Sequence, residues 1–360
     1  MRPEEFSQYV RGLAEENGLT PDRLTLGGDH LGPLVWQNEH AEQAMMKAKT
    51  LVEEYVRAGF RKIHLDCSMP LGAERELPLE LIAQRTSFLA KAAEAAADDP
   101  SKLRYIVGSE VPTAGGIMDE KERLTVTSPK AAFETIEAIR NAFEIEGLKE
   151  AWGRVRGLVV QPGVEFGDSL VHVYAREKTR KLTEMITSEP SLIFEAHSTD
   201  YQRPAALKAL VEDHFGILKV GPWLTYALRE GLIALAKIET FIQPENNSRL
   251  VEILDKTMLA YPSHWENYYH GNLIEKRISR LFSYSDRIRY YWHRPEVERA
   301  VKNLFVNLSN SNIPLTLISQ YLPAQYQKIR DGLISSDPKS LVMDKIWEVL
   351  EQYESATISG

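Results

Sequence analysis

The sequence of 360 residues contains a single cysteine, Cys67, and lacks the features of a secreted or membrane-spanning protein. One cysteine excludes an intrachain disulfide bond. No apolar run approaches the roughly 18–20 residues that cross a bilayer, and the first residues, 1–6, are amphipathic and acidic, unlike a signal peptide. We therefore expect a soluble, cytoplasmic protein without a membrane partner.

Basic residues are outnumbered, since 43 lysines and arginines against 51 acidic residues give a net charge of −8. This balance argues against a nucleic-acid partner and against attraction to anionic membranes, while a local basic pocket for a phosphate remains compatible with it. Two nucleotide-binding motifs are also missing: no glycine-rich dinucleotide fingerprint follows the first expected strand, and no GxxxxGK[ST] loop occurs. These absences argue against a Rossmann domain and leave a P-loop kinase without support.

Short apolar runs alternate with amphipathic segments in the first 223 residues. This alternation predicts parallel strands covered by helices. A closed (β/α) barrel needs eight strands. Only six are visible, so either the sheet is open and doubly wound or two strands are absent, and the start of the chain on a helix favours the second explanation. The expected strands are 24–26, 62–65, 105–107, 155–160, 193–194 and 217–220, and the expected helices around them are 3–16, 39–58, 78–97, 130–152, 176–187 and 203–211.

Residues 224–360 follow a different sequence pattern, in which long amphipathic stretches are separated by turn-rich segments. We expect a helical layer packed on the sheet rather than a separately tethered module. The expected organisation is a barrel portion at 1–223 and a helical carboxy-terminal region at 224–360. The expected helices of this region are 224–241, 248–259, 272–281, 295–306, 315–331 and 340–353.

Residues suited to chemistry stand near the carboxyl ends of the expected strands, where the loops of a parallel barrel converge on one mouth. Within 27–33, glycines let the backbone approach a ligand, while Asp29 and His30 can supply a base and a metal ligand. The alternative is a tight turn in which Asp29 caps a helix and His30 is packed. His64 and Asp66 share one face of a strand, and they form either an inward-facing pair or a structural one.

Two carboxylates and a further histidine extend this pattern. Glu110 and Glu165 each follow an expected strand, and a carboxylate there needs a cation or hydrogen-bond donors to stay charged. Together with His30 and His197 they can build a site for zinc or a similar divalent ion. The alternative is that the histidines are hydrogen-bonded core residues.

Other polar residues are candidates for substrate binding. Ser198 and Asp200 follow His197 in a short loop, and Gly221 precedes an expected helix, where a phosphate or hydroxyl can bind. Arg287 and Arg289 can pair with a phosphate. The alternatives are an ordinary turn at Gly221 and an interdomain clamp of ion pairs and aromatic rings around the arginines. The expected substrate-binding residues are Asp66, Ser198, Asp200, Gly221, Arg287 and Arg289.

Seven segments carry a resemblance to known proteins: 27–37, 58–66, 160–166, 195–202, 219–222, 285–292 and 318–323. Through them the chain resembles the GatZ/KbaZ family over essentially its whole length. Members are associated with class II tagatose-1,6-bisphosphate aldolase as its so-called non-catalytic subunit, and were once labelled tagatose-6-phosphate kinases. Some relatives instead act as metal-dependent 4-epimerases of tagatose or fructose phosphates.

The resemblance implies a TIM (β/α)8-type barrel akin to class II aldolases. It implies that Asp29 transfers a proton, that His30 binds zinc, and that Glu110 and His197 match a strand-end glutamate and histidine of those enzymes. The chain departs from that pattern at Glu165, where aldolases carry a histidine. Family members usually begin with a further segment that supplies the first two barrel strands, so we expect a barrel that lacks them, as a truncated gene product, a fragment or a protein completed by a partner.

Three functions are therefore compatible with the sequence. The chain is a subunit that supports a catalytic class II tagatose-bisphosphate aldolase, a metal-dependent epimerase of tagatose 6-phosphate and fructose 6-phosphate, or an inactive remnant of the fold. The family association favours the subunit, whereas the retained polar residues favour a working site. The expected partners are the catalytic aldolase subunit and a ketose phosphate, and homo-oligomers are also compatible with the sequence. The expected catalytic residues are Asp29, Glu110 and Glu165, and the expected metal ligands are His30, His197 and Glu165.

Overall fold

The computed structural model describes residues 1–110 and 124–358. Its centre is a curled sheet of six strands in the order β1-β2-β3-β4-β7-β8, and every neighbouring pair is parallel. A small antiparallel pair, β5 and β6, follows β4. The strands are β1 (Gly27–Leu31), β2 (Lys62–Leu65), β3 (Arg104–Val107), β4 (Val155–Val159), β5 (Glu165–Phe166), β6 (Val171–His172), β7 (Ile193–Ala196) and β8 (Ile217–Leu218).

The second to sixth expected strands are confirmed, but the expected strand at 24–26 is wrong. β1 begins at Gly27, where that strand was expected to end. The carbonyl of Leu26 accepts the backbone N–H groups of Arg61 at 2.9 Å and Lys62 at 3.3 Å, but regular strand pairing starts with Gly27 opposite Lys62. The pairing register shifts between Gly28 and Leu31, and His30 has a positive φ of 52°. The irregularity is bulge-like, and such features re-aim side chains next to functional sites.

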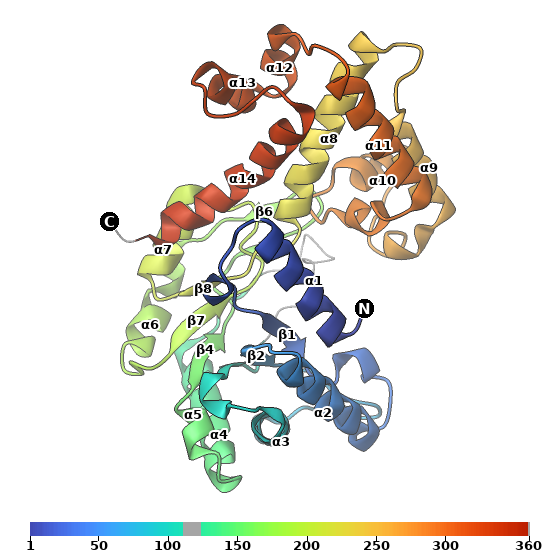
Figure 1. Cartoon of the computed structure of the whole chain (residues 1–360). Helices are drawn as coiled ribbons and strands as arrows, with labels where there is room; N and C mark the ends of the chain where they lie inside the picture. The colour runs from blue at the N-terminus through green and yellow to red at the C-terminus, as the bar shows by residue number, and fades with distance from the viewer. Residues whose placement is uncertain (111–123, 359–360) are drawn as a thin grey trace.

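Helices cover the outer face of the sheet (Figure 1). Their apolar residues recur at helical spacing, as in α2, where Ala44, Ala48, Val52 and Val56 are buried. These side chains belong to one hydrophobic core with the apolar residues of the strands. The helices of this part are α1 (Pro3–Glu16), α2 (Ala41–Arg57), α3 (Leu79–Ala96), α4 (Pro129–Ile145), α5 (Lys149–Trp152), α6 (Arg176–Ile186) and α7 (Pro204–Glu212).

The carboxy-terminal helices form a layer with a second hydrophobic core of their own. The helix expected at 315–331 is divided into two, because Pro323 lacks the N–H that a continuous helix needs. The helices are α8 (Trp223–Ile242), α9 (Leu250–Ala260), α10 (Leu273–Phe282), α11 (Pro295–Ser309), α12 (Leu315–Tyr321), α13 (Pro323–Arg330) and α14 (Pro338–Thr357), with a short 3-10 helix, η5 (Arg287–Tyr291), before α11.

The last helix, α14, runs from this layer back to α7 on the sheet side (Figure 1). Its residue Ala356 belongs to the first core rather than the second. Near the same end, the hydroxyl of Tyr353 donates to the carbonyl of Thr199, which lies in the loop after β7, at 3.0 Å. α14 therefore connects the helical layer to a loop of the sheet. Among the described helices, none has both the length and the apolar character that crossing a membrane requires.

Gly32 allows a close approach between the chain segments that follow β1 and β2. A Cβ atom at this position would lie 1.7 Å from the carbonyl oxygen of Asp66. We therefore expect Gly32→Ala to lower the free energy of unfolding by about 1–3 kcal/mol, because the backbone must shift to relieve the overlap. Chemical denaturation measures this change.

Gly12 is a matched control, since it lies within α1 and a Cβ atom added there would meet open space. Gly12→Ala is expected to stabilise the protein by about 0.5–1 kcal/mol, because alanine loses less backbone entropy than glycine in a helix. Equal unfolding free energies for the Gly32 variant and the unaltered protein would contradict the close approach.

Candidate functional site

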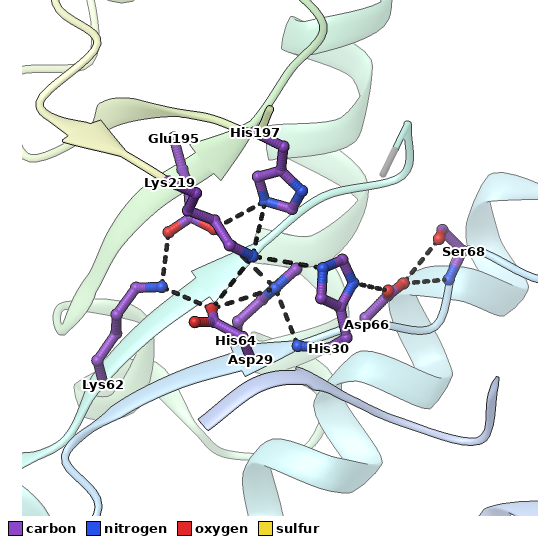
Figure 2. Close-up of polar contacts among 9 residues, drawn as sticks. All are labelled: Asp29, His30, Lys62, His64, Asp66, Ser68, Glu195, His197 and Lys219. Carbon is purple, nitrogen blue, oxygen red and sulfur yellow. Dashed lines mark hydrogen bonds and ion pairs between the residues drawn. The ribbon is translucent and has the colours of Figure 1, made fainter. Parts of the chain in front are cut away.

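The curl of the sheet brings polar side chains from both ends of its strand order into one group (Figure 2). Residues two apart along a strand point to the same face. Lys62 and His64 of β2 therefore point the same way, and His197, which directly follows β7, lies two residues after Glu195. β1 contributes Asp29 and His30, and Lys219 follows β8. We call this group the interior cluster: Asp29, His30, Lys62, His64, Glu195, His197 and Lys219.

Ion pairs link the two carboxylates of the cluster to its two ammonium groups. Lys62 Nζ lies 2.7 Å from Asp29 Oδ1 and 2.8 Å from Glu195 Oε2. Lys219 Nζ lies 3.3 Å from Asp29 Oδ1 and 3.6 Å from Glu195 Oε1. The charges of these groups therefore balance.

The same contacts set the protonation of the carboxylates. Burial alone would raise the pKa of Asp29, but the ammonium groups of Lys219 and Lys62 outweigh burial and hold that pKa below its usual value. Burial likewise opposes ionisation of Glu195, yet its hydrogen bond with His197 and the charge of Lys62 lower its pKa. Both carboxylates are therefore ionised at neutral pH.

Three imidazole rings lie together in the cluster. The centroid of His30 is 5.0 Å from that of His64 and 5.1 Å from that of His197. Burial lowers the pKa of His64 to about 3, and burial also lowers the pKa of His197. The rings of His64 and His197 are therefore neutral at pH 7 and keep a lone pair for a proton or a cation.

Asp66 fixes the orientation of His30. Its Oδ2 lies 2.9 Å from His30 Nδ1, and its Oδ1 receives the hydroxyl of Ser68 at 2.7 Å. Although burial opposes ionisation, these hydrogen bonds lower the pKa of Asp66 to about 2. In the tautomer that this contact selects, His30 donates from Nδ1 and turns the lone pair of Nε2 toward the cluster. Asp66, an expected substrate-binding residue, thus contacts His30 and Ser68.

The donor types of the cluster fit a divalent metal ion. Donor atoms of His30, His64 and His197 lie within 4.8 Å of one another, and so do those of Asp29, His64 and Glu195. Neutral imidazoles with nearby carboxylates are the ligands that zinc prefers among proteins' nitrogen and oxygen donors. His64 Nδ1 accepts the N–H of His30 at 3.3 Å, and its Nε2 is buried with no hydrogen-bond partner among the residues described.

Glu165 lies beside the cluster, because its carboxylate accepts a hydrogen bond from Ser198, the residue after His197. It also accepts the N–H of Phe166 at 3.0 Å. Burial raises the pKa of Glu165 to about 7. Glu165 belongs to neither group of metal-donor atoms in the described part of the chain, and its expected role as a ligand stays a prediction. His64, by contrast, belongs to both groups of donor atoms.

Glu110, the other expected catalytic carboxylate, is exposed and receives the hydroxyl of Thr127 at 2.6 Å. It too lies outside both groups of donor atoms found among the described residues. The structure therefore brings together Asp29, His30 and His197 from the expected catalytic and metal-binding residues, with Glu165 beside them.

The expected phosphate position at Gly221 is filled by a carboxylate of the protein itself. Asp200 accepts the N–H of Gly221 and the N–H of Trp223, each at 2.9 Å, at the start of α8. Burial raises the pKa of Asp200 to about 6. These backbone donors are thus already used by Asp200.

The two arginines expected to bind phosphate make contacts inside the helical layer. Arg287 donates to the carbonyl of His264 at 2.9 Å, and its guanidinium lies 3.0 Å from the centre of the Tyr268 ring. Arg289 donates to the carbonyl of Asp286 at 3.1 Å and to the hydroxyl of Tyr290 at 2.9 Å. The aromatic part of the alternative is therefore found, whereas these contacts are to carbonyl oxygens and rings within one layer rather than ion pairs between domains.

Sequence reasoning assigned no role to Lys62, Glu195 or Lys219. The available signal was the placement of Lys62 and Glu195 two residues before His64 and His197, within strands that are otherwise apolar. A charged residue in a buried parallel strand is unusual, because such strands read as nearly continuous hydrophobic runs.

Comparison with known proteins gives a match over nearly the whole chain. Residues 1–358 match the family model for D-tagatose-1,6-bisphosphate aldolase subunit GatZ/KbaZ-like proteins. The crystal structure of a probable tagatose 6 phosphate kinase from Sinorhizobium meliloti 1021 has a TM-score of 0.91 and 43% identity, over 99% of this chain and 88% of that chain.

Two further structures match with much lower scores. A fructose-bisphosphate aldolase from Campylobacter jejuni has a TM-score of 0.40 and 14% identity, over 87% of this chain and 76% of its own. A fructuronate-tagaturonate epimerase from Cohnella laeviribosi has a TM-score of 0.41 and 13% identity, over 91% of this chain and 68% of its own.

Proposed function

Since the chain belongs to the GatZ/KbaZ-like family of D-tagatose-1,6-bisphosphate aldolase subunits, we propose that it acts in ketose-phosphate catabolism and carries a catalytic site of its own. The proposed reaction is the 4-epimerisation that interconverts tagatose 6-phosphate and fructose 6-phosphate. The observation that carries this proposal is the interior cluster of imidazoles, carboxylates and ammonium groups, of which His64, Glu195 and His197 are buried. Burying ionisable groups costs free energy that an apolar interior would avoid, and this supports a chemical role.

Epimerisation at C4 can proceed by breaking and remaking one carbon–carbon bond. A base takes the proton of the 4-hydroxyl, the C3–C4 bond breaks, and its electron pair moves onto the C2 carbonyl to give an enediolate and an aldehyde. The aldehyde turns its other face toward C3, the bond forms again, and the base returns the proton to O4. No oxidant or reductant is needed.

The residues of the site suit these steps. Glu165, with a pKa raised to about 7 by burial, is poised both to accept and to return a proton near neutral pH. Lys62, which pairs with Asp29 and Glu195, places positive charge where the enediolate would carry negative charge. His30, His64 and His197 would hold a divalent metal ion, proposed to be zinc, which as a Lewis acid polarises the substrate oxygens.

We also propose that the sheet is part of a (β/α)8-type barrel. Its order leaves β1 and β8 as the two edges, and a closed barrel needs two more strands between them. The meeting of Lys219, after β8, with Asp29 of β1 across the interior supports a barrel-like curl.

A second candidate function is that of a subunit supporting a catalytic class II tagatose-bisphosphate aldolase, and the family description favours it. In this role the chain would stabilise its partner, and turnover would belong to that partner. The two functions differ in whether the chain alone converts substrate.

An assay of the purified chain separates them. With tagatose 6-phosphate and Zn²⁺, formation of fructose 6-phosphate is followed through phosphoglucose isomerase and NADP-dependent glucose-6-phosphate dehydrogenase. We expect turnover without any aldolase, loss of turnover in His197→Ala, and full turnover in His40→Ala, whose side chain is exposed. A folded, zinc-loaded chain that is inactive alone but raises the activity of an added aldolase would favour the supporting subunit.

A further inference from the structure

Lys219 has an unusual set of neighbours for an ammonium group. Its Nζ lies 3.2 Å from His197 Nε2 and 3.4 Å from His30 Nε2, in addition to its contacts with Asp29 and Glu195 (Figure 2). The same imidazoles are two of the three whose donor atoms lie within 4.8 Å of one another. The ammonium group therefore sits among the atoms that would bind a metal ion.

Lys62 has a different position, although it contacts the same two carboxylates. It pairs with Asp29 at 2.7 Å and with Glu195 at 2.8 Å, and neither contact involves an imidazole. Both lysines therefore balance the charges of the carboxylates, but only Lys219 also contacts the imidazole nitrogens of His30 and His197.

The charges of the cluster disfavour the binding of a further cation while both ammonium groups are present. Asp29 and Glu195 are already matched by Lys62 and Lys219. A divalent ion would bring two further positive charges, and the Asp66 carboxylate beside His30 offsets only one of them. The excess positive charge repels at short range and in partly buried surroundings. Departure of the Lys219 ammonium removes one of these charges and frees His30 Nε2, while His197 Nε2 keeps its contact with Glu195 Oε1 at 2.9 Å.

Lys219 is also placed so that it can leave. It follows the last residue of β8, outside regular secondary structure, and 20% of its side chain is exposed. Lysine side chains have long flexible stems that let the ammonium group reach solvent while the stem stays on the protein.

From these contacts we infer that Lys219 is a built-in competitor of the metal ion: its ammonium group and a divalent cation occupy the same position alternately. The inference rests on the proposed function in using the same cluster as a cation site. It predicts a property of the protein that is measured without substrate, so it stands or falls separately from epimerase activity.

The first test is Zn²⁺ affinity, measured at constant pH by competition with a chromophoric chelator. Lys219→Met is expected to lower the Kd for Zn²⁺ by about tenfold or more, because the competing charge and its occupancy of the donors are both removed. Lys219→Gln, which keeps a polar end and serves as a second variant if the first does not fold, is expected to lower the Kd as well.

Two comparison variants separate occupancy from charge. Lys62→Met removes a positive charge next to the same carboxylates and is expected to lower the Kd less than Lys219→Met does. Lys345→Met removes a lysine of similar exposure, 26% against 20%, that pairs with Glu230 at 3.4 Å on the helical layer, and is expected to leave the Kd unchanged. An unchanged Kd in both Lys219 variants, or an equal decrease in Lys62→Met, would overturn the inference.

The unaltered chain provides a second measurement. Saturating Zn²⁺ should speed reductive methylation of Lys219, followed by peptide mass mapping, because the displaced ammonium group becomes exposed, and it should not speed methylation of Lys62. Protection of Lys219 by bound Zn²⁺ would show that the lysine stays in place and would reject alternate occupancy.

Discussion

Replacing Glu165 with glutamine is expected to lower kcat for the interconversion of tagatose 6-phosphate and fructose 6-phosphate by about 10²–10⁴-fold, the usual contribution of a general acid–base group. Glutamine keeps the size and polarity of the side chain but cannot take up a proton. Glu165 is 2% exposed and hydrogen-bonded to Ser198 beside His197, so the substitution acts next to the interior cluster. Glu298→Gln, on the exposed face of α11, is the matched control and should keep full activity.

The pH dependence gives this prediction a separate readout. Because the base must be unprotonated to begin the reaction, kcat/KM of the unaltered protein should rise with pH through an apparent pKa near 7. In Glu165→Gln, this rise of kcat/KM with pH should be absent. If Glu165→Gln keeps an activity within twofold of the unaltered protein and still shows the rise of kcat/KM with pH, Glu165 does not transfer the proton.

The contribution of Glu165 to folding stability should fall as the pH rises, whereas kcat/KM should increase. The pKa of Glu165 is raised in the folded state from an ordinary value of 4.5 to about 7, so its stabilising contribution is fully present below pH 4.5 and is lost as the pH rises through 7. Glu165→Gln has no such loss. The melting temperature of the variant relative to the unaltered protein should therefore increase between pH 6 and pH 8, which a disruptive substitution would not produce.

Replacing Asp286 with alanine is expected to lower the free energy of unfolding by about 3–5 kcal/mol, the usual effect of removing one partner from a buried ion pair. Asp286 Oδ1 lies 2.8 Å from Arg229 Nη1, and the side chains are 0% and 2% exposed. Asp286 also accepts the hydroxyl of Thr225 at 2.6 Å. Without Asp286, the guanidinium of Arg229 would remain buried next to the ring of Tyr226 and the carbonyl of Ser283, with no opposite charge.

Urea denaturation at neutral pH measures this loss, and two further variants identify its cause. Asp286 has a positive φ of 48°, which asparagine adopts more readily than alanine, so Asp286→Asn separates backbone strain from loss of charge. The double variant Arg229→Met with Asp286→Ala should be more stable than Asp286→Ala alone, because no unpaired charge remains. A loss below about 1 kcal/mol in Asp286→Ala, the range of an ordinary substitution, would mean that the pair is not critical.

Most helices and strands could be predicted from the sequence because the spacing of apolar residues is a local property. α1 was expected at 3–16 and is found at Pro3–Glu16, and β2 was expected at 62–65 and is found at Lys62–Leu65. β1 was misplaced because its own residues, Gly27–Leu31, are rich in glycine and polar side chains, and their pairing with β2 overrides weak local propensity. The short β5–β6 pair was not expected either, since two-residue strands leave no periodic pattern.

The candidate site was predictable only in part, for a similar reason. The position of catalytic groups at strand ends placed His30 and His197 near one mouth, and their rings lie 5.1 Å apart. Lys219 and Asp29 meet because the sheet curls until residues from its two edge strands face each other. No local sequence pattern encodes that curl. The hydrogen bond from the N–H of Gly221 to Asp200 could not be predicted either, because the packing of the loop after β7 on the start of α8 brings the two residues together.

The contact between Tyr353 and Thr199 means that the helical layer and the site loop do not move independently. Thr199 follows Ser198, whose hydrogen bond holds Glu165, and precedes Asp200, which binds the first backbone N–H groups of α8. A protein that docks on the helical layer and shifts α14 would therefore pull on the segment that positions the proposed base.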